Sequence, residues 1–150
     1  MPKAIDDSYG RPLKDLRISV TDRCNFRCPY CMPAEVYGER YKFISRENLL
    51  TFEEIVRITS ILVELGVEKV RITGGEPLVR QDVDKLIAMI SELEGVKDLA
   101  MTTNAYLLKG FVKKLRKAGL KRITVSLDSL DEKIFQEMNG RGFGTAKVLD

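Results

Sequence analysis

Short apolar segments alternate with helical patterns along this chain, and that alternation is the strongest constraint on its fold. The strand-like segments are residues 16–21, 69–73, 96–102 and 122–127. Helical periodicity appears in residues 49–65, before the second strand-like segment, and again after the second, third and fourth segments, in residues 83–93, 108–118 and 131–138. A further helix starts near residue 144. Repeated strand–helix order with short connections predicts parallel strands that are joined by right-handed crossovers.

The number of these units limits the size of the sheet. The 150 residues hold about four strand–helix units, whereas a complete eight-unit barrel needs roughly 250 residues. The predicted fold class is therefore α/β, as a partial (β/α) TIM-type barrel that is truncated after about four units. A small open sheet is the alternative. We expect residues 1–150 to form one domain, because no linker or low-complexity segment divides them.

Local signals also fix the ends of the first predicted helix. Thr51 and Glu54 stand at the spacing of a capping box, in which each side chain bonds the backbone of the other residue. Gly66 follows the last apolar position and is a typical helix terminator.

Charge and hydropathy exclude several classes of partner. The chain has 25 basic and 22 acidic residues, a formal net charge of +3, with the two signs interspersed. This mild balance argues against nucleic acid as a partner. The apolar runs have the length of strands, so no membrane span is predicted. The first ten residues lack the apolar core of a secretory signal, and we therefore expect a cytoplasmic protein.

Three cysteines with the spacing CxxxCxxC follow the first predicted strand, where α/β folds place functional loops. They are Cys24, Cys28 and Cys31. An odd number of cysteines so close together does not suit a disulfide framework. The sequence has no histidine, which removes histidine metal ligands and histidine acid–base catalysis.

This cysteine loop suits an iron–sulfur cluster. A [4Fe–4S] cluster normally takes four cysteines, so three leave one iron with an open coordination position that can bind and activate a ligand. A structural zinc site normally needs four protein ligands, and no fourth cysteine or histidine is present in the sequence. Zinc binding remains the alternative at this point.

A second polar motif, TGGEP at residues 73–77, follows the second predicted strand. Paired glycines allow the backbone to approach a ligand closely, and the adjacent carboxylate of Glu76 can accept hydrogen bonds from an ammonium group. An ordinary strand-to-helix turn is the simpler interpretation of the same residues.

The cysteine motif, with Tyr30 directly before its last cysteine, resembles the signature of the radical S-adenosylmethionine superfamily. The GGEP segment is similar to the second motif of that superfamily. The resemblance implies that Cys24, Cys28 and Cys31 hold a [4Fe–4S] cluster. It also implies that the open iron chelates the amine and carboxylate of S-adenosyl-L-methionine, and that Tyr30 lies near the adenine.

The same resemblance assigns further cofactor contacts. Gly75 is expected to contact the methionine end of S-adenosylmethionine. Ser126 and Asp128 lie at the end of the fourth predicted strand, where a polar pair suits contacts with the ribose or methionine. A helix N-cap is the alternative role of that pair.

Longer segments resemble the GTP 3′,8-cyclase family of molybdenum cofactor biosynthesis, namely residues 7–11, 16–25, 31–33, 70–78, 101–104 and 126–130. In that family, arginines and a threonine on the barrel strands contact GTP, and the matching positions are Arg17, Arg71 and Thr102. Arginine suits phosphate and guanine acceptors because its donors form a rigid fork. The resemblance further implies a reducing electron donor, and a homodimer for the full-length enzyme.

One departure from the family shapes the interpretation. The family carries a second three-cysteine cluster in a C-terminal segment, whereas this sequence has no cysteine after Cys31. We interpret the chain as the N-terminal part of a radical S-adenosylmethionine core domain and expect no cyclic product from it alone. Two alternatives stay open: a radical S-adenosylmethionine enzyme with another substrate, such as a peptide, and a non-catalytic electron carrier or zinc-stabilised module.

Overall fold

The computed structural model describes residues 5–150, which form a four-stranded parallel sheet with helices between the strands. The strands lie in chain order and are β1 (Asp15–Ser19), β2 (Lys69–Thr73), β3 (Asp98–Thr103) and β4 (Arg122–Val125). The helices are α1 (Phe52–Glu64), α2 (Val83–Ser91), α3 (Val112–Lys117), α4 (Glu132–Asn139) and α5 (Ala146–Leu149). Three short 3₁₀ helices are η1 (Arg46–Asn48), η2 (Pro77–Val79) and η3 (Leu108–Gly110).

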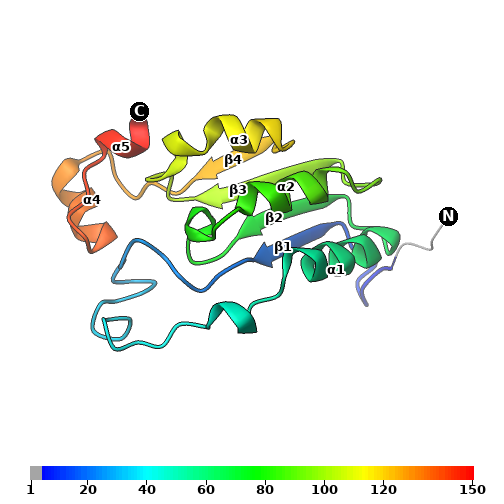
Figure 1. Cartoon of the computed structure of the whole chain (residues 1–150), viewed down its shortest axis with the longest axis horizontal. Helices are drawn as coiled ribbons and strands as arrows, with labels where there is room; N and C mark the ends of the chain where they lie inside the picture. Colours follow the sequence, from blue (N-terminus) through cyan, green and yellow to red (C-terminus); the bar gives the residue numbers. More distant parts are fainter. Residues whose placement is uncertain (1–4) are drawn as a thin grey trace.

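This arrangement confirms the predicted fold class, a partial (β/α) barrel of four parallel strands. In Figure 1, α1, α2 and α3 cover one face of the sheet. Side chains of β2 alternate between its two faces, so Val70 and Ile72 are buried while Arg71 is only partly buried. The core joins strand residues Val70, Ile72, Leu99 and Met101 to helix residues Ile55, Leu86, Ile87, Ile90 and Leu115.

The opposite face of the sheet is polar. Arg17 of β1 is the register partner of Arg71 of β2, and Thr102 of β3 is that of Thr124 of β4. Register partners in adjacent strands project to the same side. A row of arginine and threonine side chains therefore lies on the face that the helices leave uncovered.

Two predicted helix boundaries require correction. The capping box forms, with Thr51 Oγ1 accepting from Glu54 N at 3.2 Å and Glu54 Oε2 accepting from Thr51 N at 2.8 Å. The cap makes α1 begin at Phe52, so the prediction of helix from residue 49 was wrong. The predicted helix 108–118 is two elements, η3 and α3, because Gly110, a poor helix former, ends the first turn.

The carboxyl edge of the sheet carries most of the irregular structure. Figure 1 shows the long segment between β1 and α1, together with α4 and α5, beyond the arrowheads of the strands. Arg27 N donates to Asn139 O at 2.8 Å, which joins the segment after β1 to the end of α4. Within residues 5–150, none of the helices combines the length and hydrophobicity that a membrane span requires.

Candidate functional site

The three cysteines lie in the loop that leaves the carboxyl end of β1. Cys24 and Cys28 are half-buried, and Cys31 is exposed. A tight turn closes the loop, because the backbone N–H groups of Cys31 and Met32 both donate to Cys28 O, at 3.0 and 2.8 Å. The loop therefore holds all three thiols at the edge where the second and fourth strands also end.

An aromatic cluster anchors this cysteine loop. Phe26 is 3% exposed, and its ring lies 6.0 Å from the rings of both Tyr106 and Phe135 and 5.7 Å from that of Phe143. These partners come from the segment after β3, from α4 and from the segment before α5. Sequence reasoning missed this cluster, since its members are up to 117 residues apart, which is the difference between 143 and 26.

The paired glycines bring the turn after β2 against the cysteine loop. Gly75 N donates to Thr21 O at 2.6 Å, and Glu76 N donates to Arg23 O at 2.8 Å. A Cβ at Gly75 would overlap the backbone of Arg23 and lie 2.9 Å from Asp22 O. The close approach that these glycines permit is thus made by the loop itself, and the contact of Gly75 with S-adenosylmethionine stays a prediction.

A Gly75→Ala substitution should therefore displace the cysteine loop. We expect a loss of stability of about 1–3 kcal/mol, as for other overpacked sites, and a lower iron content after anaerobic reconstitution. Gly110→Ala is the matched control, because a Cβ there meets nothing within 4 Å. Denaturant unfolding and iron analysis of both variants test this, and equal values for the two would contradict it.

Glu76 has a structural role that the sequence did not reveal. The residue is only 1% exposed. Its carboxylate accepts three hydrogen bonds. The donors are Leu78 N at 3.1 Å, Thr103 Oγ1 at 2.7 Å and Asn104 N at 2.8 Å. Burial raises the pKa of this carboxyl, and the three hydrogen bonds oppose the rise. The carboxylate thus ties the end of β2 to the end of β3 rather than facing an ammonium group.

Polar donors surround the sulfur of Cys24. Phe26 N donates to its Sγ at 3.4 Å, and Asn104 Nδ2 lies 3.9 Å from the same sulfur. Asn104 Nδ2 also donates to Asn25 Oδ1 at 2.8 Å. Asn25 Nδ2 is buried and has no hydrogen-bond partner among the described residues. Burial raises the pKa values of the Cys24 and Cys28 thiols, so iron binding at these sulfurs must release protons.

These observations fit a cluster whose thiolates carry negative charge. The unpartnered Asn25 amide and the donors at Cys24 are suited to sulfur acceptors, which in iron–sulfur sites commonly receive hydrogen bonds. Among residues 5–150, no three His, Cys, Asp or Glu side chains are grouped as ligands of one metal ion. A cubane cluster binds each cysteine to a different iron, so its thiolates stand further apart than those of a zinc site.

Tyr30 and Ser126 lie at the same edge of the sheet. Tyr30 Oη donates to Asp128 Oδ1 at 2.9 Å, which joins the cysteine loop to the segment after β4. Burial and this hydrogen bond raise the pKa of Tyr30, although 63% of the residue is exposed. Ser126 directly follows β4, and its N–H donates to Thr103 O at 2.9 Å. The structure thus brings both residues to the edge that bears the cysteines.

The structure also groups the three predicted substrate residues. Arg71 Nη1 donates to Thr102 Oγ1 at 3.1 Å and to Thr124 Oγ1 at 2.9 Å. Arg17 stands beside Arg71 on the neighbouring strand. Neither arginine takes part in an ion pair within the described residues. Like charges on paired strands destabilise a sheet, so an anionic ligand on this polar face would be stabilising. The sequence analysis did not identify Thr124, because only its pairing with Thr102 in the sheet places it in this group.

The chain is similar to known proteins along nearly its whole length. The model of the Radical SAM superfamily matches residues 18–150. Two curated relatives, both named GTP 3′,8-cyclase, are 54% identical: that of Staphylococcus saprophyticus over 99% of this chain and that of Staphylococcus haemolyticus over 100%. The chain spans 44% of the length of each of these relatives.

Solved structures show the same architecture. SuiB of Streptococcus suis, bound to precursor peptide SuiA, has a TM-score of 0.67 and 29% identity, over 89% of this chain and 28% of that chain. BtrN, in complex with AdoMet and 2-DOIA, has a TM-score of 0.60 over 97% of this chain and 56% of that chain. At 16% identity, BtrN supports the fold alone.

Proposed function

Because this chain belongs to the radical S-adenosylmethionine superfamily, we propose that it is the N-terminal part of a GTP 3′,8-cyclase. Such an enzyme is a lyase of molybdenum cofactor biosynthesis. Identity of 54% along the whole chain to relatives of that name supports the proposal. The structural observation that carries it is the pair Arg17 and Arg71, two cations without acidic partners in the described residues, beside Thr102 on the polar face of the sheet.

The cofactors of the superfamily are a [4Fe–4S] cluster and S-adenosyl-L-methionine. Cys24, Cys28 and Cys31 would hold the cluster, and Tyr30, Gly75 and Ser126 are the proposed contacts of S-adenosylmethionine. When bound, these cofactors supply the 5′-deoxyadenosyl radical that takes the 3′ hydrogen of GTP. The chain itself positions the reactants and keeps water away from them.

Each group of residues has a distinct task in this proposal. The cysteine loop is fixed against the turn after β2 by Gly75 and against α4 by Phe26. Arg17 and Arg71 bind phosphate or guanine acceptors of GTP, and Thr102 and Thr124 orient the Arg71 guanidinium. An external electron donor reduces the enzyme. We place the full-length protein in the cytoplasm, as a homodimer.

Replacing Arg71 with alanine should separate substrate recognition from cofactor chemistry. In the full-length enzyme we expect cyclisation of GTP to fall by about 10- to 100-fold, as for a lost charge-assisted hydrogen bond. Cleavage of S-adenosylmethionine without GTP should change little. Anaerobic assays with chromatography of both products measure the two rates.

The control for this experiment is Arg57→Ala on the exposed side of α1, which should leave both rates unchanged. Equal loss of cyclisation and cleavage in the Arg71 variant would mean that Arg71 supports the fold or the cofactor instead.

A substrate other than GTP is the rival within the superfamily. The structure of SuiB with its precursor peptide is a neighbour of this chain, but at 29% identity rather than 54%. Titration with GTP separates the two candidates. Saturable binding of GTP that the Arg17→Ala variant lacks supports the cyclase, and binding that is equal in both proteins counts against it.

A further inference from the structure

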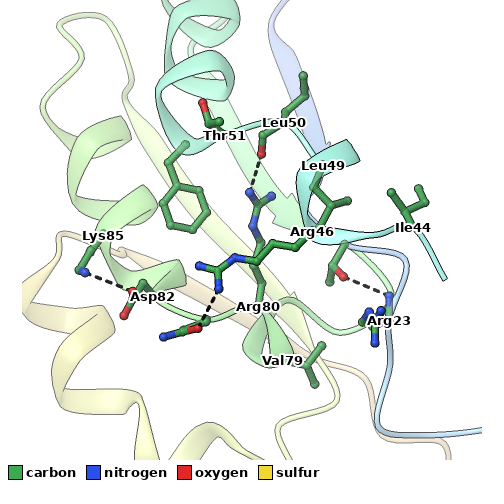
Figure 2. A pocket seen from close by; sticks show the side chains of 13 residues that line it. Arg23, Ile44, Arg46, Leu49, Leu50, Thr51, Val79, Arg80, Asp82 and Lys85 are labelled. Atoms are coloured by element: carbon green, nitrogen blue, oxygen red, sulfur yellow. Dashed lines mark hydrogen bonds and ion pairs between the residues drawn. The ribbon is translucent and has the colours of Figure 1, made fainter.

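A basic hollow lies between the start of the cysteine loop and the N-terminal ends of α1 and α2 (Figure 2). Its volume is about 530 Å³, and its walls come from residues 44–52 and 79–85 and from the start of the loop after β1. Figure 2 shows Arg23, Arg46, Arg80 and Lys85 around it. Asp82 is the one carboxylate of this lining, and it is paired with Lys85 at 3.2 Å.

Arg80 is a fixed positive charge in this hollow. Its guanidinium donates to Val20 O at 2.7 Å and to Leu50 O at 2.5 Å, and it lies 4.5 Å from the centre of the Phe52 ring. Backbone carbonyls satisfy these donors without neutralising the charge. Burial, followed by the nearby charge of Arg46, lowers the pKa of Arg80. The hollow thus keeps two neighbouring cations together.

Arg46 is the exposed member of that pair. Its one side-chain hydrogen bond in the described part of the chain is a long one, from Nη1 to Gln81 Oε1 at 3.4 Å (Figure 2). Neither Arg46 nor Arg23 forms an ion pair with any residue from 5 to 150. These two side chains are therefore free to meet anionic groups from another molecule.

The positive charge continues around the cysteine loop. Arg23 directly precedes Cys24, and it also lines a second hollow of about 650 Å³. Arg27, Lys42 and Arg141 line that second hollow, with Glu39 as its one acid. We call the surface of Arg23, Arg27, Lys42, Arg46 and Arg80 the basic surface. It extends over two hollows, which is larger than a single small anion needs.

We propose that the basic surface is the docking site of a small acidic electron-carrier protein with a flavin or iron–sulfur cofactor. This inference rests on the proposed function, which requires one electron from outside. In the docked complex, one electron leaves the reduced carrier and enters the cluster held by Cys24, Cys28 and Cys31, and no covalent bond forms or breaks. Charge complementarity steers such encounters and fixes their orientation. Because Arg23 directly precedes Cys24 in the chain, a carrier that is docked on the basic surface lies beside the cluster.

The test is the affinity of the full chain for a purified acidic flavodoxin in its oxidised form. At low salt, Arg46→Glu should weaken binding about tenfold, and the difference from wild type should shrink as salt rises. The matched control is Arg116→Glu, near the end of α3 and thus at the opposite edge of the sheet, which should bind as wild type does. Arg46→Glu should stay folded, because it replaces a repulsion with Arg80 by an attraction.

Two further measurements distinguish a failure of this inference from a failure of the proposed function. Wild type and Arg46→Glu should assemble equal amounts of cluster, and dithionite should reduce both equally, since a small chemical reductant needs no docking surface. Assembly of no cluster in wild type would refute the proposed function, while the binding comparison still decides the inference. Equal flavodoxin affinities of the Arg46→Glu and Arg116→Glu variants would overturn it, as would tighter binding of an RNA oligonucleotide than of flavodoxin.

Discussion

Replacing Cys28 with alanine is expected to abolish assembly of the iron–sulfur cluster. The loop supplies all three thiols of the sequence, which has no histidine to replace one of them as a ligand. With Cys28 removed, two of the four irons would lack a protein ligand. Iron and sulfide analysis after anaerobic reconstitution should give values near background, and the absorption of the cluster should be missing.

Glu35→Ala is the control for this prediction, since Glu35 is exposed in the same loop and makes no hydrogen bond there. It should bind as much iron as wild type. A Cys28→Ala variant with full iron and sulfide content would show that the ligands have been wrongly assigned.

The second large effect is expected at Glu76, on stability. Glu76→Ala leaves three buried donors without an acceptor, at Leu78, Thr103 and Asn104. Each unsatisfied buried donor costs about 1–3 kcal/mol, and we expect a total loss of about 3 kcal/mol because water can enter part of the space. Urea unfolding of the wild type and the variant measures the difference in the free energy of unfolding.

Glu94→Ala is the matched control, because Glu94 is exposed and has no side-chain hydrogen bond in the described structure. Its effect should lie within about 0.5 kcal/mol, as for other surface substitutions. If the two variants unfold at the same urea concentration, Glu76 does not join β2 and β3 in the way that we infer.

The fold follows from local signals in the sequence. The apolar segment 69–73 predicts β2, and the structure agrees. The capping residues Thr51 and Glu54 mark the start of α1 correctly, whereas helical periodicity placed that start too early, at residue 49. Parallel strands then place the cysteine loop, Gly75 and Ser126 at one edge, because parallel strands all end on the same side of a sheet. The predicted position of the site, at the carboxyl edge of the sheet, thus follows from strand direction alone.

The contacts that hold the site together are not local, and a single sequence does not contain them. The hydrogen bond between Asn25 and Asn104 joins residues 79 positions apart, and that between Tyr30 and Asp128 joins residues 98 positions apart. Glu76 is a further example, since its position next to two glycines gave no indication that folding would bury its carboxylate. Such contacts depend on which loops meet, and this is decided by the packing of the whole sheet.

The central claim is that three cysteines leave one iron of the cluster free to bind S-adenosylmethionine. The most direct test is the electron paramagnetic resonance spectrum of the full chain, reconstituted anaerobically, reduced with dithionite and recorded with and without S-adenosylmethionine. The account predicts a signal of a reduced [4Fe–4S] cluster whose g values shift when S-adenosylmethionine is added. A cluster signal that is identical in both samples would contradict it.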